Sequence, residues 1–257
     1  MSVANARMYA VNAASATAWR ALLQWVAQRA DVAADVIDYP PPQPLSSLWS
    51  RGDLACAFMC GHPFSRAMPQ PVPLAAPVPI SDLYRNEPVY WTCIVARDDS
   101  GLRTLPDTFG RRMAYTTPDS QSGYQALRAL VAGVADPFSA MVGPLVTPRR
   151  VVEAVLAGAA DAGPVDSYAL DLMRLHEPAL VAPLRVIATT APTPIPLLVA
   201  SRALPAAEVD RLRQALADVE HAHALADTRA ALLLRRFAIV DAQAYAVLRE
   251  PRGNALV

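Results

Sequence analysis

Residues 54–61 form an unbroken apolar run, Leu-Ala-Cys-Ala-Phe-Met-Cys-Gly, without a charged side chain. A strand of this kind has to be covered on both faces, as parallel strands between two layers of helices are. It is preceded by a strand-like segment at 7–12, an amphipathic helix at 17–30, a strand at 32–39 and a short helix at 44–51. This order predicts a parallel sheet with right-handed crossovers, which is an α/β fold.

A second alternating series occupies the middle of the chain. Its predicted elements are helices near 105–110, 124–133, 148–158 and 167–175 and strands near 113–117, 140–146 and 160–165. Further strands are predicted at 89–97, 184–190 and 195–201, and helices at 205–222, 224–236 and 242–248. Residues 69–79 carry so many prolines that they favour an edge strand or an extended connection over a central strand. Two such series predict two lobes with a ligand cleft between them.

Charge and composition exclude several functional classes. The chain contains no lysine, so all 23 basic residues are arginine, and the formal net charge is zero. Schiff-base chemistry and a P-loop lysine are therefore excluded, and a nucleic-acid partner is not expected because such binding needs excess positive charge. The longest apolar runs are far shorter than a membrane span, so no membrane insertion is expected.

The N-terminus lacks the charged and apolar regions of a secretory signal. Two interpretations remain open: the chain stays in the cytoplasm, or the start of a secreted precursor is absent from it.

Cys56, Cys60 and His62 raise the question of a metal site. In an extended strand the two cysteines would lie roughly 13 Å apart, at about 3.3 Å per residue. Zinc holds its sulfur ligands at about 2.3 Å, and a disulfide needs similarly close sulfurs, so both are excluded without a sharp bend. The cysteines are predicted to be core thiols, and neither a metal nor a cofactor is expected.

Residues 113–133 combine a short strand, a turn of small hydroxylated residues and a helix. The turn is predicted at Ser120, Gln121, Ser122 and Gly123, with helical spacing from Tyr124. Free backbone N–H groups and the positive end of the helix dipole would converge there, which suits a small anion. The alternative is that Asp119, Ser120 or Ser122 serves only as an ordinary helix cap.

Several segments, in this order, resemble the phosphate/phosphonate-type substrate-binding proteins of ABC transporters, which have the type II periplasmic-binding-protein fold. They are residues 48–61, 90–100, 105–110, Ser120-Gln-Ser-Gly-Tyr124, 157–168 and 190–196. The resemblance covers roughly residues 45–220. It implies one lobe from 1–88 plus 195–257 and a second from 89–194, closing on a small anionic or polar solute, with an ABC permease as partner. It also implies a periplasmic location and no enzymatic activity.

The resemblance also implies which residues face the ligand. They are Ser120, Gln121, Ser122 and Gly123 in the turn, Tyr90, Trp91 and Thr92 at the lobe crossing, Gly61 and His62 after the third strand, and Asp166, Tyr168 and Thr190. Neighbours in a strand point to opposite faces, so at most one of Tyr90 and Trp91 is expected to line the cleft. Asp166 could equally be a helix cap.

The pattern departs from family members that bind aminoalkylphosphonates, which receive the ligand's amine with carboxylates. The loop 189–196 has no acidic residue, and Tyr168 stands at the approximate position of another carboxylate. An aminophosphonate is therefore not expected.

Two other functions remain open. Some cytoplasmic enzymes, including those of an alternative menaquinone pathway, resemble the same fold, although no nucleophile–base pair can be assembled here. Effector domains of some transcription regulators share it as well, but no helix-turn-helix segment precedes residue 7. The solute-binding interpretation ranks first.

Overall fold

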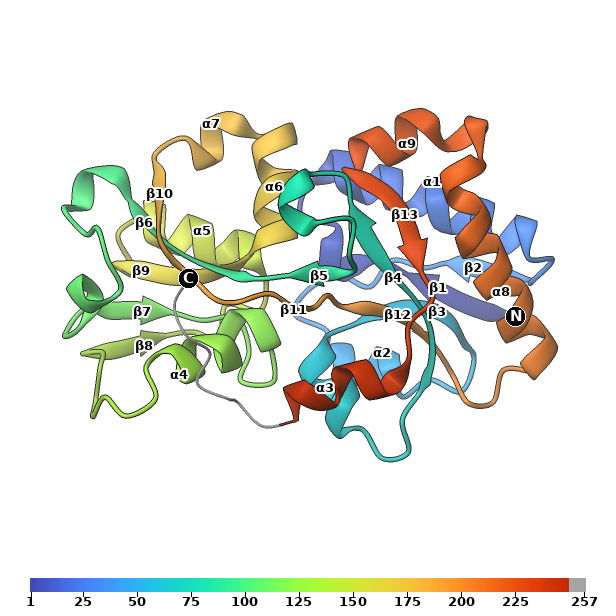
Figure 1. Ribbon diagram of the computed structural model, residues 1–257, viewed down its shortest axis with the longest axis horizontal. Coiled ribbons are helices and arrows are strands. Elements are labelled where there is room, and N and C mark those ends of the chain that lie inside the picture. The colour runs from blue at the N-terminus through green and yellow to red at the C-terminus, as the bar shows by residue number, and fades with distance from the viewer. Residues whose placement is uncertain (250–257) are drawn as a thin grey trace. The chain divides into compact units, whose positions relative to one another are not determined.

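The computed structural model describes residues 1–249, and its chain divides into two compact units. Unit 1 contains Met1–Val89 and Pro194–Val247, and unit 2 contains Tyr90–Thr193. Unit 1 is built on a six-stranded sheet and unit 2 on a five-stranded sheet (Figure 1). The predicted α/β class, with helices flanking each sheet, is confirmed.

The sheet of unit 1 is mixed, with strand order β13-β4-β12-β3-β1-β2. Strands β2, β1 and β3 are parallel, and β12, β4 and β13 join them through antiparallel ladders. The sheet is therefore less parallel than the sequence predicts. The strands are β1 (Ser2–Asn5), β2 (Ala34–Val36), β3 (Leu54–Met59), β4 (Val72–Pro79), β12 (Leu197–Ala200) and β13 (Leu234–Ala238).

Helices cover both faces of this sheet. Helix α1 packs against α8 and α9, while α2 packs on β3 from the opposite face (Figure 1). Trp19 of α1 is fully buried and meets Phe58 of β3 edge to face at 4.9 Å, so aromatic packing fixes the helix on the sheet. The helices are α1 (Ala13–Arg29), α2 (Leu45–Trp49), α3 (Gly61–Arg66), α8 (Ala206–Asp218) and α9 (Ala226–Ala231).

The sheet of unit 2 has the order β10-β6-β9-β7-β8. Strands β9, β7 and β8 are parallel, and β6 runs antiparallel between β9 and β10. The strands are β6 (Thr92–Arg97), β7 (Arg112–Ala114), β8 (Ala140–Val142), β9 (Ala162–Asp166) and β10 (Leu184–Thr189). The two short strands β5 (Val89–Tyr90) and β11 (Thr193–Pro194) pair with each other.

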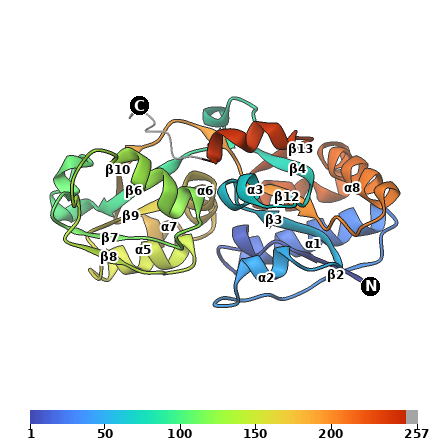
Figure 2. The same cartoon turned by 90° about the horizontal axis from the view of Figure 1, so that it is seen from below.

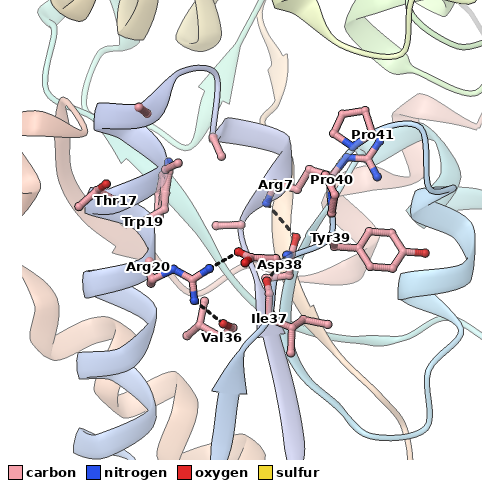
Figure 3. A pocket seen from close by; sticks show the side chains of 15 residues that line it. Arg7, Thr17, Trp19, Arg20, Val36, Ile37, Asp38, Tyr39, Pro40 and Pro41 are labelled. Carbon is pink, nitrogen blue, oxygen red and sulfur yellow. Dashed lines mark hydrogen bonds and ion pairs between the residues drawn. The ribbon is translucent and has the colours of Figure 1, made fainter.

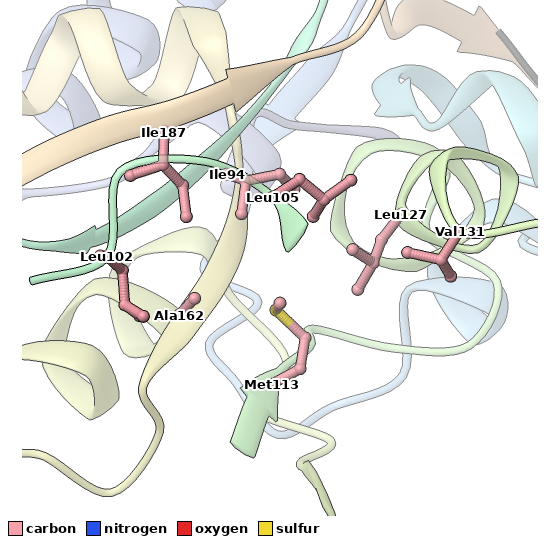
Figure 4. Close-up of a cluster of buried hydrophobic side chains, with 9 residues drawn as sticks. Ile94, Leu102, Leu105, Met113, Leu127, Val131, Ala162 and Ile187 are labelled. Atoms are coloured by element: carbon pink, nitrogen blue, oxygen red, sulfur yellow. The ribbon is translucent and has the colours of Figure 1, made fainter. Parts of the chain in front are cut away.

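An apolar core holds α4 on one face of the unit 2 sheet (Figure 4). Leu127 and Val131 point from the helical side toward Ile94 and Met113 of the strands, with Leu105 beside them. Helix α5 packs against β9, β6 and β7, and both views place it on the face opposite α4 (Figure 2). The helices are α4 (Ala126–Leu130), α5 (Pro148–Leu156), α6 (Ser167–His176) and α7 (Pro178–Val181).

Short 3₁₀ turns complete the described elements. They are Arg7–Tyr9, Asp82–Tyr84, Asp98–Ser100, Pro106–Thr108, Val219–His221, His223–Leu225 and Ala242–Leu248.

The strand predicted at 7–12 is wrong: the first strand is Ser2–Asn5, and α1 already begins at Ala13. The reason is a reciprocal capping box. The Asn12 side chain accepts a hydrogen bond from Ser15 N at 2.9 Å, and Ser15 Oγ accepts one from Asn12 N at 3.1 Å. This pair starts the helix before the apolar periodicity becomes visible in the sequence.

The edge position predicted for the proline-rich segment 69–79 is also wrong, because β4 lies between β12 and β13. Proline is tolerated inside a sheet at bulges, where the ladder is already interrupted. Both ladders of β4 shift register beside a proline, one next to Pro73 and the other next to Pro79. The irregular pairing therefore accommodates the missing N–H groups.

The helix predicted at 224–236 ends early, at Ala231, and β13 follows. Leu234 and Phe237 are buried in β13, which pairs with β4. A short apolar run gives the same periodicity signal in a strand as in a helix, so only the pairing partner decides between them.

The predicted core thiols are confirmed: Cys56, Cys60 and Cys93 are buried and none of them is part of a disulfide. Burial raises the pKa of Cys56 and of Cys93 to about 12, so both stay protonated. Within residues 1–249, histidine, cysteine and carboxylate side chains nowhere gather into a group of three that could bind a metal. No helix among these residues has the length and apolar character of a membrane span.

We predict that Asn12→Ala lowers the free energy of unfolding by about 1 kcal/mol, because it removes the side-chain acceptor of the capping box. Urea denaturation measures the loss. Asn12→Ser is the control and should retain most of the stability, since serine caps about as well as asparagine. Equal losses in both variants would contradict the capping explanation.

Candidate functional site

The segment predicted as a turn at 120–123 is instead the start of a helix. Ser120 is the N-cap residue, and its Oγ accepts a hydrogen bond from Gly123 N at 3.0 Å. A π-helical turn, Gln121–Gln125, then leads directly into α4. The capping role considered for Ser120 is therefore confirmed, and the turn itself supplies the first N–H groups of the helical segment.

Contacts from two strands fix this helical start. Thr92, the first residue of β6, donates from its Oγ1 to Ser122 O at 3.1 Å. Thr116, just beyond β7, donates its backbone N–H to Gly123 O at 3.2 Å. The carbonyl groups of Ser122 and Gly123 are thus satisfied by Thr92 and Thr116.

Gly123 is required by space rather than by backbone conformation. A Cβ at this position would lie 1.9 Å from Oγ1 of Thr116 and 2.8 Å from its Cγ2. The close approach leaves Thr116 Oγ1 buried without a hydrogen-bond partner, an arrangement that costs free energy.

Ser122 is the residue of the turn with unused donors. It is only 8% exposed, and neither its N–H nor its hydroxyl makes a hydrogen bond to any of the described residues. Gly123 N, by contrast, is satisfied by Ser120. Two adjacent donors at the positive end of a helical segment form a place where an anionic oxygen gains hydrogen bonds.

Other predicted residues gather at the start of β6. Thr190 and Thr92 exchange two hydrogen bonds at 3.0 Å, one through Thr190 Oγ1 and one through Thr190 N. Asp166 lies opposite Thr92 in the β6–β9 ladder, and its Oδ1 accepts from Ala169 N at 2.9 Å. The helix-cap interpretation of Asp166 is therefore confirmed. Thr92 links this group to Ser122.

The aromatic residues differ in exposure. Tyr90 and Tyr168 are buried, at 1% and 0% exposed, whereas Trp91 is half-buried. The backbone N–H of Trp91 donates to Ser167 Oγ at 3.2 Å. Burial, with Asp166 nearby, raises the pKa of Tyr168 well above that of an ordinary tyrosine. The Tyr168 side chain is thus a neutral phenol and not a second carboxylate.

Gly61 and His62 belong to unit 1, where they form the start of α3 rather than the predicted loop. Both are buried, and the His62 carbonyl accepts from Ser65 Oγ at 2.8 Å. Their role toward a ligand stays a prediction.

Thr116 is the residue of the site that the sequence analysis missed. It is 4% exposed and contacts the turn through its backbone and its side chain. The available signal was the pair Thr116-Thr117 between a buried strand and the serine-rich turn.

A family model for the periplasmic substrate-binding protein of phosphonate ABC transporters matches residues 10–245. This chain belongs to that family. The family assignment agrees with a fold whose neighbours among solved structures are binding proteins. A comparison with curated protein sequences finds no match.

Two solved structures illustrate the likeness of this phosphonate-type binding protein. A binding-protein component of an ABC phosphonate transporter from Pseudomonas aeruginosa is 16% identical, with a TM-score of 0.80 over 96% of this chain and 84% of that one. PhnD1 from Prochlorococcus marinus, solved in complex with methylphosphonate, is 16% identical, with a TM-score of 0.77 over 97% and 96%. The family and these neighbours are substrate-binding proteins rather than enzymes.

We predict that Gly123→Ala lowers the free energy of unfolding by about 1–3 kcal/mol, because the new methyl group overlaps Thr116. Helix propensity alone would give the opposite sign. Gly52→Ala is the matched control, since nothing lies within 4 Å of its added Cβ. Denaturant unfolding compares the two. A Gly123→Ala protein as stable as the parent would show that the contact with Thr116 is not tight.

Proposed function

We propose that this protein captures a small phosphonate, or a phosphate-like oxyanion of similar shape, at the turn Ser120–Gly123 and presents it to the permease of an ABC transporter. The observation that carries the proposal is the pair of unused donors on Ser122, the N–H and the hydroxyl. Ligand oxygens would replace water at these donors, and the helix dipole favours their negative charge. Membership of the phosphonate-type family supports the same ligand class and a periplasmic site of action.

The environment favours a phosphonate without an amino group. An amine would need a carboxylate to receive it, and the segment 189–196 contains none. Asp166 Oδ1 caps helix α6 by accepting the N–H of Ala169, and Tyr168, at the approximate position of another carboxylate, is a neutral phenol. Methylphosphonate is therefore a better probe for this site than an aminoalkylphosphonate.

We predict that Ser122→Ala weakens methylphosphonate binding about tenfold or more, because one hydrogen bond to a charged group contributes about 1.5–3 kcal/mol. Isothermal titration calorimetry measures the change. The urea midpoint of the ligand-free protein should stay the same, since the Ser122 hydroxyl makes no bond within the described residues.

Ser139→Ala is the control for the Ser122 variant: Ser139 is an exposed serine of the same unit, and its loss should leave affinity intact. Equal affinity of Ser122→Ala and the parent would remove the turn from the binding site.

The second part of the proposal is that units 1 and 2 are lobes that close on the ligand. The chain passes between them at 89–90 and at 193–194, within the paired strands β5 and β11. Two connections in one small sheet suit a hinge, because few backbone angles need to change.

We predict that methylphosphonate decreases the radius of gyration in small-angle X-ray scattering, because a ligand held by both lobes stabilises the closed state. Ser122→Ala should respond only at a higher ligand concentration. Saturating ligand without any decrease would contradict closure while leaving binding at the turn intact.

A further inference from the structure

Ile195 joins the two connections of the chain on the side of unit 1. It is fully buried and directly follows the passage at 193–194. In the sequence Pro194-Ile195-Pro196 it carries the only backbone N–H group, because proline has none. This N–H donates to Pro88 O at 3.0 Å, and Pro88 directly precedes β5, the other connection.

The carbonyl group of Ile195 is held by a tyrosine from the C-terminal part of unit 1. The Tyr245 hydroxyl donates to Ile195 O at 2.7 Å, in a fully buried position. Burial raises the pKa of Tyr245, so the hydroxyl stays protonated and remains a donor. The Tyr245 ring meets Phe64 of α3 edge to face at 5.2 Å, which fixes the direction of the hydroxyl.

The segment that presents Tyr245 is a 3₁₀ helix of seven residues, Ala242–Leu248, and both views place it beside α3 (Figures 1 and 2). Asp241 begins it by accepting the N–H of Gln243 on Oδ1 at 2.9 Å and the N–H of Ala244 on its carbonyl at 3.1 Å. A 3₁₀ helix rarely exceeds three or four residues, because its hydrogen bonds are poorly aligned. Packing on unit 1 through buried Tyr245 therefore helps to maintain this one.

These contacts leave Ile195 little freedom to rotate. Both of its backbone groups are bonded, to Pro88 O and to the Tyr245 hydroxyl. The following residue, Pro196, restricts Ile195 further to extended backbone angles. Movement of one unit relative to the other needs backbone angles to change at the connections. The connection at 193–195 is thus stiff at its unit 1 end.

We infer that Tyr245 is a positioning residue whose hydroxyl stiffens this connection and thereby limits the movement of units 1 and 2 relative to each other. A restricted connection lowers the conformational entropy that closure on a ligand has to remove. The inference rests on the closure put forward under the proposed function, whereas its test needs no ligand.

The first test is amide hydrogen exchange of the ligand-free full chain, measured by NMR. Tyr245→Phe keeps the ring on Phe64 and removes only the hydroxyl. The exchange rate of the Ile195 amide, divided by the mean rate of the β3 amides, should rise about three- to tenfold, the size expected for the loss of one neutral hydrogen bond. The division removes any contribution from global unfolding.

Tyr39→Phe is the matched control. It also removes a tyrosine hydroxyl of unit 1 that donates to a backbone carbonyl, that of Pro44, at 2.9 Å. Tyr39 lies beside Pro40 and Pro41 at a cavity formed by residues between 5 and 41, away in sequence from both connections (Figure 3). The relative exchange rate of the Ile195 amide should be the same in Tyr39→Phe as in the parent.

The second test measures the movement itself, by double electron–electron resonance between nitroxide labels in the ligand-free protein. Gln28→Cys in unit 1 and Ser139→Cys in unit 2 provide exposed attachment points, while the three native cysteines are buried. The distribution of label distances should be broader in Tyr245→Phe than in the parent. Tyr39→Phe should give the distribution of the parent.

An unchanged relative exchange rate at Ile195 in Tyr245→Phe would overturn the inference. Faster exchange with an unchanged distance distribution would overturn it as well, because the hydroxyl would then stabilise unit 1 alone. A parent protein that fails to bind methylphosphonate would refute the proposed function and leave both of these measurements valid.

Discussion

The contact between Gly123 and Thr116 is the constraint on which the candidate site depends. Only a residue without Cβ allows the helical start to lie this close to the segment after β7. The bond from Thr92 to Ser122 O then ties the same turn to β6, and Ser120 caps it. Contacts from β6 and from the segment after β7, together with the Ser120 cap, thus hold one short piece of backbone in place, so that its donors need little reorganisation when an anion binds.

Much of the fold could be predicted from the sequence because burial follows local pattern. The apolar run 54–61 predicts a buried strand and contains β3. The helical spacing of apolar residues in 148–158 predicts a helix, and α5 lies within that range. Two of the failures, at 69–79 and at 224–236, have a common cause: pairing between distant segments decided the outcome. Residues 234–238 become a strand because β4 is available to pair with them, and the prolines of β4 are tolerated because its ladders are irregular. Neither fact is encoded in a short window of sequence.

The residues of the candidate site fall into the same two groups: those that the local sequence reveals and those that only contacts between distant segments reveal. Ser120 and Ser122 were recognisable, since small hydroxylated residues before a helix have a local role that sequence reveals. Thr116 was not, because its importance comes from a contact across the fold, with Gly123.

A crystal structure of the complex with methylphosphonate tests the central claim most directly. The account predicts phosphonate oxygens within hydrogen-bonding distance of the N–H and the hydroxyl of Ser122, with Gly123 still packed on Thr116. A phosphonate bound elsewhere, with Ser122 making no contact to it, would contradict the account.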